Sequence, residues 1–298
     1  MQNQHSTNVK QIIDLHESNQ HIINLIESNK PFSIVRLGNE SNYVFNQIYN
    51  VEYQPSYFDD VKCTLTGIYS KKKDVQVLKD FTTKHIESIK NSDCLASFAV
   101  NFNNLVPLQK IFANSFPHIE LIHSRSIEPF HIRETNQIPW SRYLKGKKVL
   151  IINSFVESFQ SQMKNGFKLY NDCNIFVDDQ EFIYYKSFQT CVGNHVHEDW
   201  NETLNIMCND IKDLDFDIAL LGCGSYGLPM CNYIKTKLQK SAIYIGGGIQ
   251  LLFGVKGERW RTHDVISKII NNCKCEFIRP SQEETIPNAK KIENGCYW

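Results

Sequence analysis

The chain has 298 residues, enough for one large α/β domain or two small domains with proper cores. Its 32 basic and 32 acidic side chains cancel, and duplex-binding proteins usually carry a basic excess, so we expect no nucleic-acid partner. The polar start has no apolar signal segment, and no run of about 18 apolar residues is present to span a membrane. We therefore expect a cytoplasmic protein whose 10 cysteines are reduced.

The first 30 residues are predicted to form a helical extension. Apolar residues between positions 7 and 29 recur at the spacing of one or two amphipathic helices, and Pro31 ends this region. Residues 32–38 then predict a short buried strand that leaves through Gly38, and residues 43–48 predict a helix after a polar turn. We place the extension at residues 1–30 and a single Rossmann-like catalytic domain at residues 31–298.

Strands and helices alternate along the rest of the chain. We predict strands at residues 93–100, 119–123, 149–152, 175–177, 217–221 and 242–245, and helices at residues 71–91, about 158–169 and 228–238. The run at 149–152 is continuously apolar, as expected for a strand covered on both faces. The alternation predicts an α/β fold with a doubly wound, mostly parallel sheet.

A glycine-rich turn follows the strand predicted at 217–221. Gly222, Gly224 and Gly227 match G-x-G-x-x-G between a strand and a helix, as that motif requires. The first glycine permits the tight turn, the second lets a ligand approach the backbone, and the third lets the helix pack close to the sheet. N–H groups at the helix start would then face an anion; Ser225 could add a donor and Tyr226 could stack on a ring.

The following strand distinguishes between possible ligands of this turn. It ends at Gly246 and Gly247, where a dinucleotide site would usually place an acid for the ribose. The turn is therefore interpreted as a phosphate or sugar-nucleotide site rather than an NAD site. A tight turn with glycines for packing alone is the other interpretation.

Polar residues at the other predicted strand ends should converge on this turn, because ligands of open α/β sheets bind outside the carboxyl ends of the strands. Arginine suits bidentate phosphate contact, and a carboxylate could hold a divalent ion or act as a base. A local ion pair at a helix start is the alternative for Arg36 and Glu40. The candidates at these strand ends are Arg36, Gly38, Asn39 and Glu40, and Asn153, Ser154, Glu157 and Ser158. Separately, Lys256 and Arg259 lie beside Trp260 and suit a diphosphate or an acidic sugar, and a solvated turn is the other interpretation.

Three other groups have metal-ligand chemistry but a weaker pattern. His195, His197 and Asp199 would align only on a strand, whereas the residues before them suggest a loop. Asp178 and Asp179 could hold a cation after the strand predicted at 175–177. The pair Cys273 and Cys275 lacks a second pair at zinc-site spacing.

Several of these segments resemble glycosyltransferases of the GT-D type. Residues 32–40 resemble the opening motif of that family, in which a strand runs into an arginine, a glycine and an acidic pair. Residues 147–158, 221–229, 245–260 and 295–298 resemble polysaccharide-cluster proteins related to the family.

The resemblance implies transfer of a sugar from a nucleotide-sugar donor, with an Asp-x-Glu motif holding a divalent metal, Mn or Mg. Here Asn39 and Glu40 are adjacent and Ser41 falls where the second acid would be, so Glu40 would bind the metal alone. Arg36 and the glycine turn would neutralise the donor diphosphate, and Glu40 or Glu157 would bind metal or deprotonate the acceptor.

The predicted partners are a UDP- or GDP-linked sugar and a glycan or glycoconjugate acceptor. An S-adenosylmethionine-dependent methyltransferase and a non-catalytic nucleotide- or glycan-binding module remain alternatives. The sequence does not indicate an oligomeric state.

Overall fold

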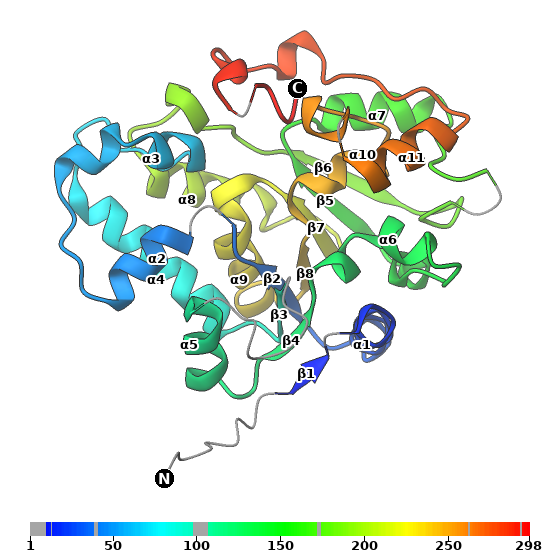
Figure 1. Ribbon diagram of the computed structural model, residues 1–298, viewed down its shortest axis with the longest axis horizontal. Coiled ribbons are helices and arrows are strands. Elements are labelled where there is room, and N and C mark those ends of the chain that lie inside the picture. Colours follow the sequence, from blue (N-terminus) through cyan, green and yellow to red (C-terminus); the bar gives the residue numbers. More distant parts are fainter. Residues whose placement is uncertain are drawn as a thin grey trace.

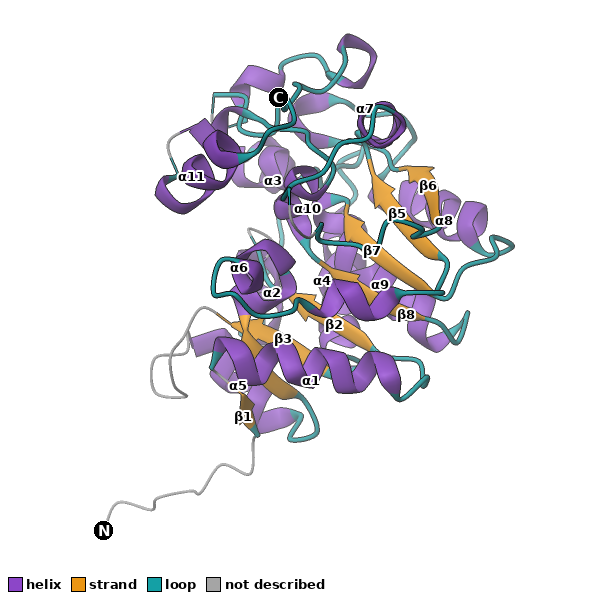
Figure 2. Ribbon diagram, turned by 90° about the vertical axis from the view of Figure 1, so that its right-hand side faces the viewer, coloured by secondary structure: helices purple, strands orange, loops and turns teal. Residues whose placement is uncertain are grey.

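The computed structural model describes residues 10–12, 14–38, 41–97, 107–171, 174–261, 263–292 and 294–298. Within them the core is an eight-stranded sheet of order β1-β4-β3-β2-β8-β7-β5-β6, and every described strand pairing is parallel (Figures 1 and 2). This confirms the doubly wound α/β fold. The strands are β1 (Gln11–Ile12), β2 (Ser33–Arg36), β3 (Cys94–Ser97), β4 (Glu120–His123), β5 (Val149–Asn153), β6 (Phe182–Lys186), β7 (Ile218–Gly222) and β8 (Ser241–Tyr244).

Helices cover both faces of the sheet (Figure 2). One face carries α2 (Ser41–Ile48), α3 (Val61–Thr66), α4 (Val75–Lys90), α5 (Pro107–Ser115), α8 (Trp200–Ile211) and α9 (Gly227–Thr236). The other face carries α1 (Leu15–Glu27), α6 (Pro129–Arg133), α7 (Val156–Lys164), α10 (Ile249–Leu252) and α11 (Asp264–Asn272).

Strand β5 shows why the central strands are apolar throughout. Leu150 and Ile152 belong to the hydrophobic core on the α9 face, and Val149 and Ile151 belong to the core on the α1 face. Successive side chains of a strand point to opposite faces, so a strand covered on both sides needs apolar residues at every position. The prediction for residues 149–152 is confirmed.

The N-terminal helix packs against the sheet. Asp14 caps α1 by accepting hydrogen bonds from the backbone amides of His16 and Glu17 (2.8 and 3.0 Å), which satisfies two of the free N–H groups at the helix start. Ile22, Ile23 and Ile26 enter the core on that face. The two-residue β1, which was not predicted, pairs with β4 just before this helix. The boundary at residue 30 stays a prediction.

The strand predicted at 175–177 is wrong. Ile175 and Phe176 are buried in a loop, and side chains rather than a neighbouring strand satisfy the backbone carbonyls there: Ser141 donates to the Ile175 oxygen (2.6 Å) and Arg142 to the Phe176 oxygen (3.2 Å). A short buried apolar run has the same pattern in a strand and in such a loop. The strand that follows β5 in the sheet is β6, which was not predicted because its half-buried edge position leaves no clear alternation.

The described cysteines are all free thiols, as expected. In the part of the chain that the structure describes, no helix is both long enough and apolar enough to cross a bilayer.

Candidate active site

A cavity of about 450 Å³ lies at the carboxyl edge of the sheet. Arg36, Asn153, Gly222 and Gly246 line it from the ends of β2, β5, β7 and β8. The neighbouring strands β2 and β8 lead to helices on opposite faces, α2 and α10, and such a divergence opens a crevice between the two connections. The predicted convergence of these four strand ends is therefore present in the structure.

Each glycine of the turn after β7 is needed at its position for a different physical reason. A Cβ on Gly222 would lie 2.5 Å from Ile249 Cγ2 and 2.8 Å from the Gly246 carbonyl oxygen, so the strand end has no room for a side chain. Gly224 has a φ of +59°, and its missing Cβ points into open space. A Cβ on Gly227 would overlap the Tyr244 ring, so this glycine brings α9 close to β8.

Ser225 and Tyr226 differ in their access to the cavity. Ser225 lines it, and its Oγ accepts a hydrogen bond from Trp200 Nε1 (3.0 Å). Tyr226 is only 2% exposed and stacks on Trp200 with ring centroids 5.4 Å apart, and its hydroxyl shares a 2.8 Å hydrogen bond with Thr190. The structure therefore does not bring the Tyr226 ring to a ligand, and burial raises its pKa well above the ordinary value.

Arg36 is held rigidly at the end of β2. Its Nη2 donates to the Ile245 carbonyl oxygen (2.7 Å), and its Nη1 lies 3.4 Å from Glu128 Oε1. Gly246 has a φ of +73°, and a Cβ there would overlap the guanidinium of Arg36. A Cβ on Gly248 would lie 2.5 Å from Glu128 Oε1. The run of glycines after β8 thus makes room for an arginine and a carboxylate against the backbone.

Glu128 was not predicted, although it is the only carboxylate among the described residues that line the cavity. Burial raises its pKa, but the hydrogen bond from His131 Nε2 (3.2 Å) and the charge of Arg36 outweigh this, and the net pKa is below the ordinary value. The glutamate is therefore a paired anion. Its sequence signal was weak because it precedes Pro129 in a short segment outside any recognised motif.

Of the two polar residues at the end of β5, one lines the cavity and the other makes only internal contacts. Asn153 lines the cavity while its Nδ2 donates to the Gly222 carbonyl (2.6 Å), which ties β5 to β7. Ser154 is buried and accepts from Gln189 Nε2 (3.0 Å). Ser154 is not among the residues that line the cavity.

The N-terminus of α7 already has an anion, supplied by Glu284. This carboxylate, 4% exposed, accepts from the backbone amides of Glu157 (2.9 Å), Ser158 (3.2 Å) and Ser281 (3.2 Å), and from the Ser158 hydroxyl. The side chain of Glu157 points elsewhere and pairs with Lys186 (2.9 Å), both half-exposed. Neither Glu157 nor Ser158 lines the cavity.

Residues after 252 complete the cavity wall. Arg259 lies over the Tyr297 ring, 4.7 Å from its centroid, and both line the cavity. Lys256 does not; its Nζ lies 6.0 Å from the Phe277 ring centroid. A Cβ on Gly257 would overlap the backbone of residues 296 and 297, so the segment 295–298 seats directly on this loop. Figure 1 shows this segment above the ends of the strands.

Two lining residues carry buried polar atoms that lack hydrogen-bond partners in the described structure. They are the carbonyl oxygen Oε1 of Gln250 and the indole Nε1–H of Trp260, on side chains that are 1% and 6% exposed. The other end of the Gln250 amide is occupied, because Nε2 donates to the Tyr297 carbonyl (2.8 Å). An unpaired buried polar group costs about 1–3 kcal/mol, so both atoms would gain from a ligand hydroxyl or water.

The remaining predicted residues are distributed as follows. Gly38 and Gly247 line the cavity. Asn39 and Glu40 lie outside the described residues. A divalent metal would need carboxylate or carbonyl oxygens, and the one described carboxylate of the lining is committed to Arg36 and His131. The described residues therefore do not assemble a Mn or Mg site, and we derive no step through a metal.

The other candidate metal groups do not form sites among the described residues. His195 stacks on Tyr69 (centroids 4.4 Å apart), His197 Nδ1 contacts the Thr203 hydroxyl (3.0 Å), and Asp199 caps α8. The three side chains thus serve local contacts rather than a shared ion. Separately, Asp178 pairs with Lys168 (2.7 Å), and the Cys273 thiol donates to the Lys168 carbonyl (3.3 Å).

The fold and the cavity define a doubly wound α/β protein whose arginine-lined site lies at the carboxyl edge of its sheet. A family model described as a GT-D fold-like domain matches residues 13–252, and the chain belongs to this family. No curated protein and no solved structure matches the chain. Residues 253–298, which include Arg259, Trp260, Glu284 and Tyr297, lie beyond the family match.

Proposed function

We propose that the protein is a glycosyltransferase that moves a sugar from a UDP- or GDP-linked donor to a glycan or glycoconjugate acceptor. The supporting observation is the cavity at the carboxyl edge of a GT-D-type sheet, which is lined by Arg36, Arg125 and Arg259 and, among the described residues, by a single carboxylate, Glu128. A diphosphate leaving group gains negative charge as the glycosidic bond breaks, and prearranged cations stabilise that charge. Guanidinium groups also bind phosphate oxygens in bidentate fashion.

Arg36 is the central diphosphate contact in this proposal. Its bonds to Ile245 and Glu128 orient it before the donor arrives, so little conformational entropy is lost on binding. Gly224 leaves the backbone of the turn after β7 open to the phosphates. Arg259, stacked on Tyr297, lines the same cavity and would be a second diphosphate contact.

The sugar is assigned to the lining residues Gln250 and Trp260. A carbonyl acceptor and an N–H donor, both buried and unpaired, match the hydroxyl groups of a sugar, each of which can donate and accept. Trp260→Phe keeps an aromatic side chain, though a smaller one, and removes the N–H donor. We expect it to weaken donor binding about 5- to 30-fold, as expected for one lost hydrogen bond of about 1–2 kcal/mol.

Glu40 is the proposed base or metal ligand, on the resemblance of residues 32–40 to the family motif. Glu157 is the weaker candidate, because its carboxylate pairs with Lys186 and is not part of the described cavity lining. A base must reach the acceptor hydroxyl within hydrogen-bond distance, so position decides between the two.

The test is thermal unfolding and calorimetric titration with a panel of UDP- and GDP-sugars, with and without Mn²⁺ or Mg²⁺. We expect at least one donor to raise the melting temperature, and Arg259→Ala to abolish that shift. Arg261→Ala is the matched control, since this arginine lies in the same turn, is exposed and is not a lining residue. The absence of a shift across the panel, or equal effects of both variants, would count against the proposal. Binding of S-adenosylhomocysteine alone would support the methyltransferase alternative.

A further inference from the structure

The opposite, amino-terminal edge of the sheet holds a second cluster of chemically reactive side chains. Cys94 and Glu120 are the first residues of β3 and β4 and are register partners, so their side chains lie on the same face. His21 reaches them from α1, which covers that face. One ligand atom from each residue lies within 4.8 Å of the other two.

The contact between His21 and Glu120 differs from an ordinary ion pair. His21 Nε2 lies 2.5 Å from Glu120 Oε2, yet this buried oxygen accepts no hydrogen bond in the described structure. The Glu120 oxygen is therefore buried beside an imidazole nitrogen with no aligned donor, and an ion placed between the two atoms would give it a partner. Ligands of a tetrahedral zinc ion, with bonds of about 2.0–2.3 Å, are separated by roughly 3.3–3.8 Å. Shifts of about 1 Å would therefore accommodate the ion.

The donor set also selects the ion. A thiolate, an imidazole and a carboxylate suit the borderline-soft Zn²⁺ better than Mg²⁺ or Ca²⁺, which prefer oxygen ligands alone. The thiolate and carboxylate would balance the charge of the ion, so its burial between helix and sheet leaves no excess charge. Lys10 holds the other carboxylate oxygen of Glu120 (2.9 Å) and would orient this ligand from outside.

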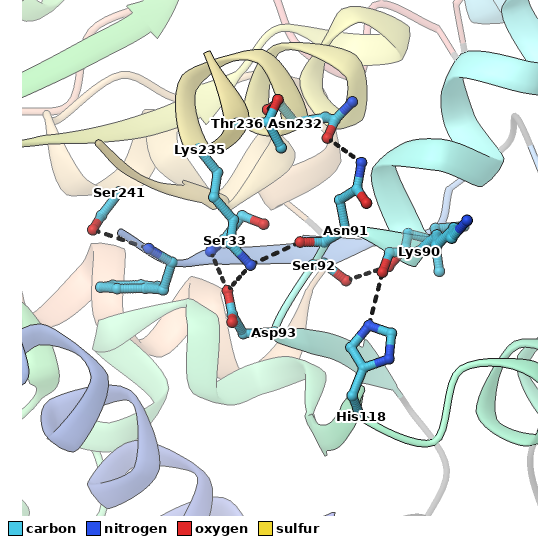
Figure 3. A network of polar contacts seen from close by, with 12 residues as sticks. Ser33, Lys90, Asn91, Ser92, Asp93, His118, Asn232, Lys235, Thr236 and Ser241 are labelled. Atoms are coloured by element: carbon cyan, nitrogen blue, oxygen red, sulfur yellow. Dashed lines mark hydrogen bonds and ion pairs between the residues drawn. The ribbon is translucent and has the colours of Figure 1, made fainter. Parts of the chain in front are cut away.

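A fourth protein ligand is not supplied by the nearest acid. Figure 3 shows that Asp93 is committed elsewhere: it accepts from the Ser33 amide (2.8 Å) and from Lys235 Nζ (2.7 Å). The fourth position is therefore assigned to water.

We propose that His21, Cys94 and Glu120 bind one Zn²⁺ ion, which fastens α1 to the start of β3 and β4. On binding, Zn–N, Zn–S and Zn–O bonds form, and the Cys94 proton passes to solvent. This site lies at the other edge of the sheet from the arginine-lined cavity, and it does not depend on the function proposed for that cavity.

The experiment uses the full chain, stripped of metal with a chelator and titrated with Co²⁺ and then Zn²⁺. We expect one equivalent of Co²⁺ to produce a thiolate-to-cobalt charge-transfer band and the intense visible bands of tetrahedral cobalt. Zn²⁺ should displace the cobalt and raise the melting temperature. Cys94→Ala should abolish the charge-transfer band and weaken Zn²⁺ binding by at least about 100-fold, since even loss of an outer partner costs 10- to 100-fold.

Matched controls separate this site from surface binding. His16 lies exposed on the same helix, and Cys275 is a thiol elsewhere in the chain; His16→Ala and Cys275→Ala should leave the spectrum unchanged. Glu120→Gln and His21→Ala, at partly exposed positions, test the site if Cys94→Ala folds poorly. Absence of the charge-transfer band in the wild type, or its persistence in Cys94→Ala, would overturn the proposal. The spectrum reports on the thiolate and not on turnover, so failure here would leave the glycosyltransferase proposal intact.

Discussion

The units β5–α7 and β7–α9 are neighbours in the sheet and share one plan, in which an apolar strand ends in a polar turn that opens a helix. The two turns differ in whether another part of the chain accepts hydrogen bonds from the free amides at the helix start. At α7, Glu284 from a segment beyond the family match accepts the free amides, so the helix start is closed by the protein itself. At α9, Gly222 and Gly224 keep the turn small, and it stays part of the cavity wall. A helix start attracts an anion in either case; what differs is whether the chain supplies one.

The largest expected effect on stability comes from removing the carboxylate that caps α7; we call this capped helix start the closed turn, and the turn at Gly222–Gly227 the open turn. Glu284→Ala removes a buried carboxylate that accepts several hydrogen bonds and faces the α7 dipole, so we expect the free energy of unfolding to fall by about 3 kcal/mol. Urea denaturation measures this loss. Glu283→Ala, at the exposed neighbouring position, should change stability by less than about 0.5 kcal/mol. Equal losses in the two variants would show that Glu284 is not the cap.

Adding a side chain in the open turn should lower the free energy of unfolding by somewhat less. Gly222→Ala places a methyl group against the Ile249 side chain and the Gly246 carbonyl, and we expect a loss of about 2–3 kcal/mol from overpacking. Gly224→Ala meets open space and should lose only about 1–2 kcal/mol, the penalty for a left-handed alanine. Denaturant unfolding of the two variants side by side decides this, and a greater loss for Gly224→Ala would reverse the assignment of their roles.

Acid should weaken the open turn through His85, which lies under it against Phe81 and Trp200. Burial lowers the pKa of His85 from 6.5 to about 4. Between these pH values the unfolded state binds a proton at this histidine and the folded state does not. Stability should therefore fall as the pH drops from about 6.5 towards 4, by up to about 3 kcal/mol at 1.36 kcal/mol per pKa unit.

The His85→Leu variant checks this sign. Its free energy of unfolding should change less with pH over the same interval, as measured by urea titrations at several pH values. An unchanged pH slope in the variant would mean that another group controls the acid transition.

The smallest effect is expected at Glu157, which lies in the closed turn but pairs with Lys186 near the surface. Glu157→Gln should change stability by no more than about 0.5 kcal/mol and leave donor binding unaltered. Lys186→Ala should behave in the same way. If Glu157→Gln alone abolished turnover while preserving donor affinity, Glu157 would have to reach the acceptor, and the distinction between the two turns would fail at that residue.

The strand–helix order could be predicted from the sequence because it depends on local periodicity, and the strand ends then located the candidate site. Arg36 and Gly222 came from this reasoning. Glu128 could not be predicted as the partner of Arg36, because they are 92 positions apart and meet only through the packing of β2 against the glycines after β8.

The same limit applies at the helix starts. The sequence alone placed Glu157 and Ser158 in the site, since a polar turn after a strand is usually open. Glu284 caps the start of α7 although it lies 126 residues beyond Ser158. The local sequence pattern carries no information over such a separation. Tyr226 was misjudged for a related reason: a turn aromatic faces ligand or core according to what lies beneath it, and here Trp200 offers a stacking surface.

The seating of residues 295–298 on Gly257 has a consequence for the order of folding. Tyr297 and Arg36 line one cavity from opposite ends of the chain, so this wall closes only after contacts of very large sequence separation have formed. Such contacts bear the greatest loop-closure entropy and are made late. The central pairing of β2 with β8 also joins distant residues, Ser33 with Ala242, so the sheet and this wall both depend on late contacts, and donor binding would report that a molecule has finished folding.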